Sequence, residues 1–456
     1  MRIIFFFLFL FVGVNIYGQS IEYKKSYKEA LALAAQTNKP LFVTLTPPAF
    51  NIKGLPQFPS GLDNKEVADL YNKNFISVKV IFTDSTVNNI TGKLHPTIFP
   101  CYVFLDSKGG IVYTSSGNTN FTIKFEDMAS QALSRIASGK TLTNYEQLYK
   151  AGSITKQQLK EYIVLKESLN IFDNAVLIDK YVDMLTVNDL NNYKEILFAL
   201  QAGPYADSKA YKLLHTNEKL FDSLYKTEPL ETRVAINNRI INNTRAEAIR
   251  TKNASMAQAN ASFMARSWSN NYQEANKAST REMLYYYKSV KDTTRYFQQA
   301  EYFYDTYYLN ITTDSARRLQ IEALNKARAV APANQPPADI RIPAPVQQVS
   351  FIQLSPAKSA EVANTLNNAA YDFYLLGTHN TTHLIKALVW SRRSIQLSPM
   401  AGYYDTMAHI MYRLDFYDEA LLNQNKAIEM AAKEPGMASR IDNLKGELAK
   451  MKSHQL

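Results

Sequence analysis

Four short runs of apolar, strand-favouring residues near the N-terminal end constrain this chain more than any other feature. Residues 41–45 and 75–82 are rich in β-branched and aromatic side chains, as is typical of strands buried on both faces of a parallel sheet. Residues 98–106 and 110–113 form the third and fourth runs, which a turn with two glycines separates. The sequence therefore predicts a buried sheet between residues 39 and 113.

Pro100 stands at the beginning of the third run. Because proline has no N–H to donate to a strand ladder, it must lie at the start or the edge of a strand. A proline that enters a central strand is also a place where a cis peptide bond is expected.

Helices alternate with these predicted strands. Asp63 is a candidate N-cap, with Glu66 three positions later as in a capping box. Residues 83–97 contain two asparagines, a glycine and a proline, and we expect a loop there. Amphipathic periodicity predicts helices over residues 27–36, 63–71 and 121–137.

Residues 38–43 (Asn-Lys-Pro-Leu-Phe-Val) and 99–106 (Phe-Pro-Cys-Tyr-Val-Phe-Leu-Asp) resemble the thioredoxin family, in its secreted branch. The resemblance covers about 120 residues and implies a thioredoxin-like α/β fold over residues 20–140. It also implies a binding edge at Phe99, Pro100 and Cys101, where the backbone beside the cis-proline pairs with extended polypeptide.

The redox motif of that family is missing. The family places Trp-Cys-x-x-Cys after the first strand, and here that loop, residues 46–55, has Phe50 and Lys53 at the two cysteine positions. Thr44 stands where the family has a buried acid, and Cys101 is the only cysteine in the chain. Dithiol exchange needs an attacking thiolate and a resolving thiol, so the sequence predicts a redox-inactive protein in which Phe50 and Lys53 face Pro100.

Cys101 allows two interpretations. A lone thiol could form mixed disulfides, and a pair with His95 could in principle make a nucleophile, although no third orienting group is evident. A free cysteine more often packs as a small buried hydrophobe, and we prefer this interpretation. His379 and His383 are four residues apart with no acid between them, which is a poor metal site. We expect no metal and no other cofactor.

The composition narrows the function further. The net charge is +10, but the basic residues are spread among acidic ones without a run of five. A nucleic-acid surface would gather them between aromatic platforms, so we expect a solvated surface and no nucleic-acid partner. With one cysteine the chain has no internal disulfide.

Residues 1–19 have one charge, an apolar core of about a dozen residues and small residues near the end, which is the pattern of a signal peptide. They are too short for a comfortable membrane span, and no later stretch approaches the required length of about 18 apolar residues. We therefore expect an exported protein, periplasmic or secreted, with no integral membrane span after cleavage.

From residue 141 to residue 330 the sequence has only helical periodicity, in degenerate units of roughly 30–40 residues. Residues 331–357 follow as a proline-rich segment, either an extended linker or an ordered crossover. The 456 residues thus divide into a signal peptide, an α/β domain, a helical domain over 141–330, this linker and a C-terminal region.

Residues 358–456 resemble tetratricopeptide repeats. Ala408, Ala420 and Ala427 have the spacing of the small residues at which paired helices come closest, and Ala387 lies 33 positions before Ala420 in an earlier copy. Residues 439–451 would be the polar capping helix. The fold class is therefore α/β thioredoxin-like followed by an all-α helical-repeat region.

Two functions remain open. The preferred one is a redox-inactive binding or scaffold module whose partner is a protein or an extended peptide, with Phe50, Lys53, Phe99, Pro100 and Cys101 as its binding residues. The alternative is a thiol-disulfide oxidoreductase-like enzyme that works through Cys101 alone.

Overall fold

The computed structural model describes residues 20–47, 59–94, 96–268, 271–312, 314–315, 318, 359–433 and 438–456. The contacts within the chain divide it into two compact units, Met1–Thr244 and Arg245–Leu456. The predicted signal peptide and the proline-rich segment both lie outside the described residues. None of the described helices has the length and apolar character that crossing a membrane requires.

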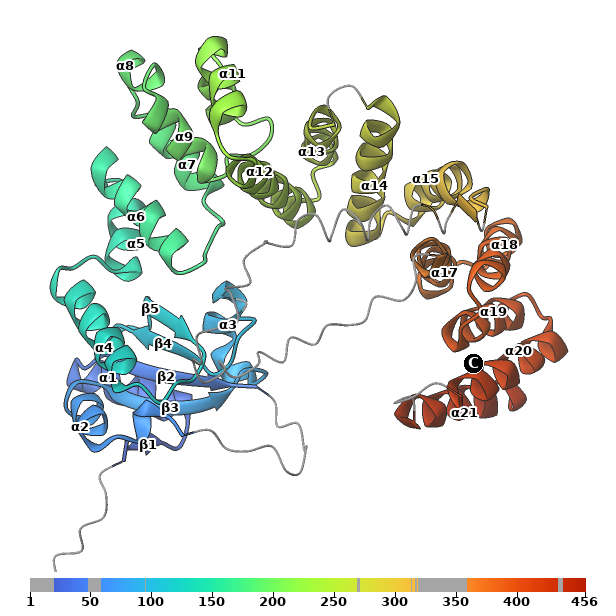
Figure 1. Ribbon diagram of the computed structural model, residues 1–456, viewed down its shortest axis with the longest axis horizontal. Helices are drawn as coiled ribbons and strands as arrows, with labels where there is room; N and C mark the ends of the chain where they lie inside the picture. Colours follow the sequence, from blue (N-terminus) through green and yellow to red (C-terminus); the bar gives the residue numbers. More distant parts are fainter. Residues whose placement is uncertain are drawn as a thin grey trace, which may run out of the picture. The chain divides into compact units, whose positions relative to one another are not determined.

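The described part of the first unit contains one five-stranded mixed sheet (Figure 1). Its strands, in spatial order, are β1 (Tyr23–Lys24), β3 (Ile76–Ile81), β2 (Leu41–Thr46), β4 (Cys101–Leu105) and β5 (Ile111–Ser116). Strands β1 and β2 run parallel to β3, whereas β4 is antiparallel to both β2 and β5. In the central register Val43 lies between Val78 and Val103. All four predicted runs are therefore confirmed as strands of one sheet.

Aromatic rings form the core on one face of this sheet. Phe42 of β2 contacts Tyr71 edge to face, with ring centroids 4.6 Å apart, and Phe104 of β4 lies 5.1 Å from Phe75. The Tyr71 hydroxyl donates to the Phe125 carbonyl at 2.9 Å, so the one polar atom of this buried side chain is satisfied. Tyr71 belongs to α2 (Lys65–Asn74) and Phe125 to α4 (Thr122–Ala137), and α1 (Tyr27–Thr37) also packs against the sheet.

The loop predicted for residues 83–97 is wrong. The Asp84 carboxylate accepts from the Thr86 N–H at 2.8 Å and caps a helical turn. Val87, Ile90 and Leu94 then recur at helical spacing and are buried, so their burial outweighs the poor helix propensity of the residues between them. The structure has η2 (Ser85–Val87) and α3 (Asn88–Leu94) in this segment.

The prediction of Asp63 as the N-cap is wrong by one residue, because the N-cap of α2 is Asn64. Asn64 caps α2 by accepting from the Glu66 N–H at 2.8 Å. The Asp63 carboxylate accepts instead from the Ser60 N–H at 3.2 Å, in a capping box that closes the short helix η1 (Gly61–Asp63). Two consecutive caps therefore fix the chain entry into α2.

The rest of the first unit is helical, as the periodicity predicts. Thr155 caps α6 (Lys156–Ser168) in a full capping box with Gln158. The helices are α5 (Leu142–Lys150), α6 (Lys156–Ser168), α7 (Ala175–Val182), α8 (Val187–Leu190), α9 (Tyr193–Gln201), α10 (Lys209–Leu214), α11 (Glu218–Thr227) and α12 (Leu230–Thr251), of which α12 continues into the second unit.

The described part of the second unit is entirely helical. Consecutive helices pack in pairs, α13 on α14, α17 on α18 and α19 on α20. Ala408 and Ala420 are fully buried where α19 and α20 meet, because small side chains allow close helix approach. The elements are α13 (Ala254–Arg266), α14 (Tyr272–Val290), α15 (Thr293–Tyr304), the π-helical turn η3 (Asp305–Leu309), α17 (Ser359–Leu375), α18 (Thr381–Leu397), α19 (Ala401–Arg413), α20 (Tyr417–Ala431) and α21 (Ala438–Lys452).

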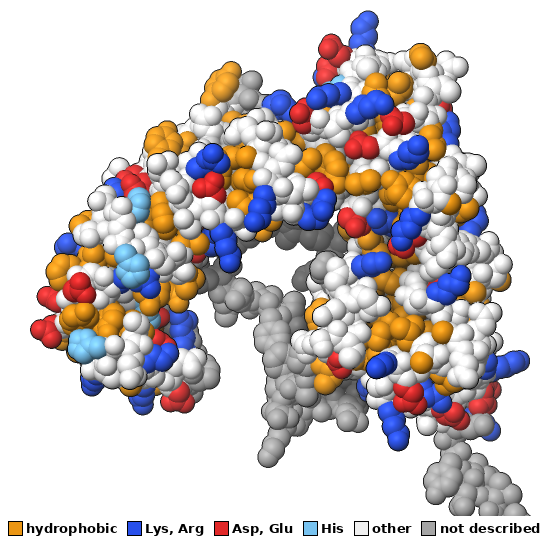
Figure 2. Space-filling view, turned by 180° about the vertical axis from the view of Figure 1, so that it is seen from behind, with side chains coloured by type: hydrophobic (Ala, Val, Ile, Leu, Met, Phe, Trp, Pro, Cys, Tyr) orange, Lys and Arg blue, Asp and Glu red, His pale blue; other side chains and the backbone are white. Residues whose placement is uncertain are grey.

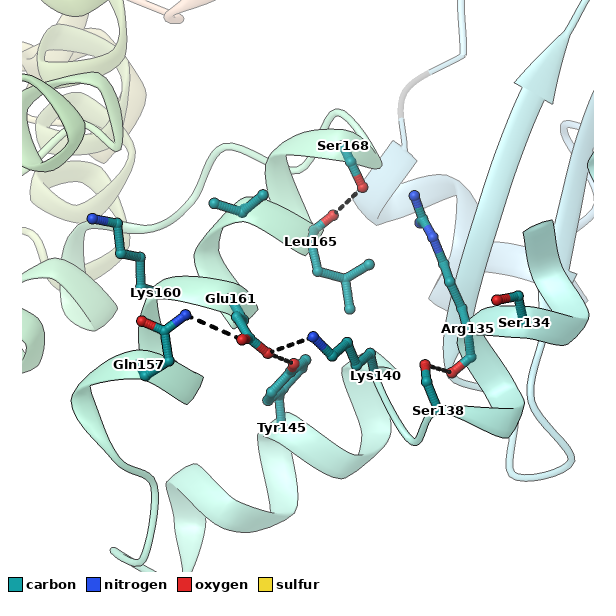
Figure 3. A pocket seen from close by; sticks show the side chains of 11 residues that line it. Ser134, Arg135, Ser138, Lys140, Tyr145, Gln157, Lys160, Glu161, Leu165 and Ser168 are labelled. Atoms are coloured by element: carbon teal, nitrogen blue, oxygen red, sulfur yellow. Dashed lines mark hydrogen bonds and ion pairs between the residues drawn. The ribbon is translucent and has the colours of Figure 1, made fainter. Parts of the chain in front are cut away.

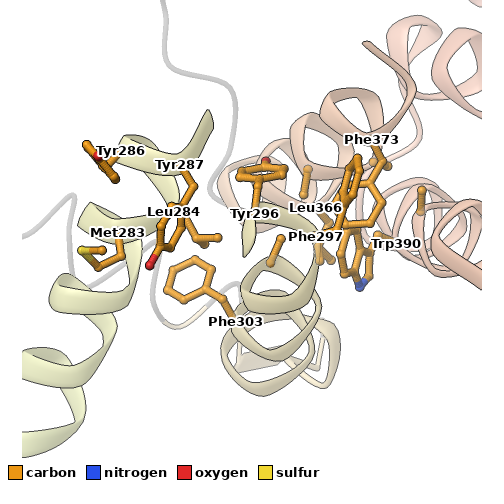
Figure 4. Close-up of a cluster of buried hydrophobic side chains, with 14 of the residues drawn as sticks. Met283, Leu284, Tyr286, Tyr287, Tyr296, Phe297, Phe303, Leu366, Phe373 and Trp390 are labelled. Carbon is orange, nitrogen blue, oxygen red and sulfur yellow. The ribbon is translucent and has the colours of Figure 1, made fainter. Parts of the chain in front are cut away.

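An aromatic cluster forms the core of the second unit (Figure 4). The Phe297 and Phe373 rings are 4.6 Å apart, and Trp390 lies 5.0 Å from Phe373. The Trp390 indole N–H donates to the Asp305 carboxylate at 2.8 Å. This cluster joins α15, α17 and α18, which are distant in sequence.

Charged side chains of both signs are interspersed on the face of the molecule that Figure 2 shows. Several are paired along one helix, as Lys426 and Lys433 are with Glu429 at 2.8 and 2.7 Å. This distribution fits the solvated surface that the sequence predicts.

We predict that Trp390→Ala lowers the free energy of unfolding of the second unit by about 3–5 kcal/mol, because it opens a cavity and removes the indole hydrogen bond to Asp305, which keeps its ion pair with Lys386. Trp390 has no exposed surface. The measurement is urea unfolding followed by the fluorescence of the remaining tryptophan.

Trp268→Ala is the matched control, since the Trp268 side chain is 43% exposed. Its free energy of unfolding should change by less than about 0.5 kcal/mol. Equal effects of the two substitutions would contradict the packing described for Trp390.

Candidate functional site

The first candidate site is the edge where β4 begins. The peptide bond between Phe99 and Pro100 is cis, and Pro100 directly precedes β4. The Pro100 carbonyl accepts from the Gly117 N–H at 2.9 Å. Both expectations for Pro100, a strand start and a cis bond, are therefore confirmed.

Cys101 is the first residue of β4 and lies opposite Leu45 of β2 and Ser116 of β5. Its side chain is 3% exposed. Burial raises the pKa of the Cys101 thiol, and a hydrogen bond with Ser116 offsets only part of this rise. The thiolate fraction is thus lower than that of a free cysteine, which is unfavourable for nucleophilic or exchange chemistry.

The surroundings of Phe99 are partly apolar. Its ring contacts that of Phe82 edge to face, with centroids 5.4 Å apart. The neighbouring Ile98 side chain is 49% exposed. Lys124 donates to the backbone carbonyls of Ser116 and Gly117, and burial lowers the pKa of its ammonium. The edge thus offers exposed apolar surface beside a cation whose bonds are to main-chain carbonyls.

Three residues named from the sequence lie outside the described residues. They are Phe50, Lys53 and His95. The prediction that Phe50 and Lys53 face Pro100 therefore stays a prediction. Thr44 is described, and it is buried in β2 between Lys79 and Tyr102.

The second candidate site is a polar groove of about 310 Å³ in the second unit, between α17, α19 and the start of α21. On α17 its wall is Asn364, Asn367, Asn368 and Tyr371, at the spacing that places side chains on one helix face. The opposite wall consists of Met400, Gly402, Tyr403, Asp405, Thr406 and Arg440.

Two groups in this groove have unused hydrogen-bonding capacity. The Oδ1 atom of Asn367 is buried and has no hydrogen-bond partner in the described part of the chain. Arg440 is exposed and forms no ion pair with any described residue. Gly402 makes room for its guanidinium, because a Cβ at residue 402 would lie 2.7 Å from Arg440 Nη2. The groove can therefore accept a hydrogen bond from a ligand at Asn367 and bind a carboxylate at Arg440.

Other groove residues are already fixed by contacts within the protein. The Tyr403 hydroxyl donates to Asn364 Oδ1 at 2.5 Å, and Gln424 Nε2 donates to Asp405 Oδ1 at 2.9 Å. The buried His409 ring lies 3.6 Å from the Asp405 carboxylate. These contacts give the groove rigid walls, which lowers the entropic cost of binding.

The two histidines with i,i+4 spacing do not act together. His383 Nδ1 lies 2.6 Å from Glu301 Oε1, and its ring stacks on Phe297. His379 is exposed in the loop before α18. Among the described residues no group of three or more His, Cys, Asp and Glu side chains is arranged to hold a metal ion.

The sequence analysis missed the groove. The pattern that could have indicated it is the set of asparagines and a tyrosine on the face of α17 opposite the buried Val362 and Leu366. Such a polar face is usually only solvated. No family model, curated protein or solved structure matches this chain.

We predict that the Cys101 thiol of the folded protein reacts with dithionitrobenzoate at least about tenfold more slowly than that of the unfolded protein, because it is buried and its pKa is raised. Absorbance of the released thiolate measures the reaction. Unfolding in guanidinium should release one equivalent per chain, since the sequence has one cysteine. Rapid stoichiometric labelling without denaturant would contradict the buried placement.

Proposed function

We propose that this chain is an exported, redox-inactive thioredoxin-like protein that binds extended peptides or proteins through its tetratricopeptide-like C-terminal helices. The observation that carries the proposal is the polar groove between α17, α19 and α21, in which the buried Asn367 Oδ1 has no hydrogen-bond partner among the described residues. Buried polar atoms without partners are rare in proteins, and a ligand N–H would satisfy this one.

An extended peptide suits this groove chemically. Its main-chain N–H groups match the Asn367 oxygen, and its carbonyls match amide donors such as that of the exposed Asn368. An acidic side chain or a terminal carboxylate matches Arg440, which has five N–H donors in a planar fork.

The strand order β1-β3-β2-β4-β5 and the cis-proline before β4 support a thioredoxin-like fold for the first unit. In such a fold the main chain beside the proline pairs with extended polypeptide, which requires no sulfur. Phe99 and Pro100 would then form an auxiliary contact surface. The N-terminal signal pattern supports export to the periplasm or the medium.

The alternative, an oxidoreductase that works through Cys101, has less support. Catalysis would require a thiolate that a substrate disulfide can reach. The Cys101 side chain is 3% exposed and the pKa of its thiol is raised.

We predict that Asn367→Ala weakens peptide binding about tenfold or more, because a buried hydrogen bond to the ligand is lost. Arg440→Glu should abolish the preference for acidic peptides by reversing the charge. The probe is an immobilised library of random decapeptides, from which the peptides that bind the full chain are selected. These peptides are resynthesised, and their affinity is measured by titration calorimetry.

Asn425→Ala is the matched control, because Asn425 is exposed on α20 and its amide bonds only to the Leu421 carbonyl within that helix. It should bind the selected peptides as the native chain does. Selected peptides that bind Asn367→Ala and Arg440→Glu unchanged, or a library from which none is retained, would refute peptide binding in this groove.

A further inference from the structure

A second cavity, of about 550 Å³, lies in the first unit between the C-terminal end of α4 and the helices α5 and α6. This volume falls within the range of about 300–1,000 Å³ that is usual for small-molecule sites. Figure 3 shows Arg135 of α4 on one side of the cavity and Leu165 of α6 on the other. Neither candidate site described above shares a residue with it.

Arg135 is a half-buried cation that has no acidic partner among the described residues. Its Nη1 donates to the Val112 carbonyl at 2.9 Å, and its guanidinium lies 5.3 Å from the Tyr113 ring centroid. No described carboxylate forms an ion pair with it. Burial lowers the pKa of the Arg135 guanidinium. Removing this charge from water costs free energy, and no described carboxylate offsets that cost.

The other cations that line the cavity are compensated. Lys140 Nζ lies 3.2 Å from the Glu161 carboxylate, and Lys160 Nζ lies 2.6 Å from that of Glu195. Glu161 also accepts from the Tyr145 hydroxyl at 2.7 Å. The uncompensated charge in the cavity is therefore that of Arg135.

Two of the serine hydroxyls in the cavity wall, those of Ser138 and Ser168, donate to main-chain carbonyls. Ser138 donates to the Arg135 carbonyl at 3.0 Å, and Ser168 donates to the Leu165 carbonyl at 2.8 Å. These bonds stay within the helix ends. The further N–H groups of the Arg135 guanidinium therefore remain for a ligand, with the Ser134 hydroxyl beside them in the lining.

The wall of α6 adds an apolar surface. Leu165 and Val164 are adjacent in the lining, and the Val164 side chain is 50% exposed. A ligand that covered Val164 would remove this apolar surface from water, which is favourable by about 25 cal/mol per Å².

We propose that this cavity binds a small amphiphilic anion, with its carboxylate or phosphate head on Arg135 and its apolar body against Val164 and Leu165. A guanidinium forms paired hydrogen bonds with either head group. An inorganic anion would leave the apolar wall in water, and a cation would meet uncompensated positive charge. This site is independent of the peptide groove in the second unit.

The test is titration calorimetry of the full chain with decanoate, decyl phosphate and inorganic phosphate as separate probes. The amphiphile with the matching head group should bind measurably, and inorganic phosphate should bind at least about tenfold more weakly. Comparison of decanoate with decyl phosphate identifies the head group. Absence of binding by both amphiphiles, or equal binding of inorganic phosphate, would overturn the proposal.

Two variants locate the site. Arg135→Gln should weaken binding of the amphiphile about tenfold or more, because it removes the charged contact. Val164→Asp should weaken it similarly, whereas Val176→Asp, a matched change at a 54% exposed valine of α7 outside the cavity, should have no effect.

Unchanged affinity in a folded Arg135→Gln variant would exclude the cavity. If that variant does not fold, the comparison of Val164→Asp with Val176→Asp decides. Equal affinities of these two variants would likewise exclude it.

Discussion

Aromatic packing in two separate cores is the interaction on which this structure depends, because a chain with one cysteine has no internal disulfide. In the first unit Phe42 and Tyr71 bring a strand and a helix together. In the second, Phe373 and Trp390 join α17 to α18. Each ring contributes a large buried area and a directional contact, and the polar atoms of Tyr71 and Trp390 are hydrogen-bonded. Cohesion and specificity thus come from the same side chains.

The strands could be predicted from the sequence because burial on both faces leaves a continuous apolar run. Residues 41–45 became β2 (Leu41–Thr46) with a boundary shift of one residue. Helix α3 could not be predicted in the same way. Its asparagines and glycine disfavour a helix locally, and only the burial of Ile90 and Leu94 against the rest of the fold stabilises it. Stabilisation of a helix by such tertiary contacts leaves no pattern in the local sequence.

The same contrast between local sequence signals and tertiary contacts applies to the candidate sites. The environment of Cys101 followed from its position after Pro100, since both belong to one strand start. The groove could not be found this way, because Asn367 and Arg440 come from helices that are distant in sequence. Arg135 presents the same difficulty. A lysine or arginine near a helix C-terminus is commonly placed there by the helix dipole, and only the folded structure shows that no described carboxylate pairs with Arg135.

Comparison of Arg135 with Arg245 shows why an uncompensated cation is informative. Arg245 forms a bidentate pair with the buried Glu282, whose carboxylate also accepts from Asn260 at 2.7 Å. That arrangement satisfies both charges within the protein. Arg135 is likewise half-buried, but among the described residues its guanidinium donates only to the Val112 carbonyl. Arg245 thus has its counter-charge within the protein, whereas Arg135 has none among the described residues, and the proposed anion would supply it.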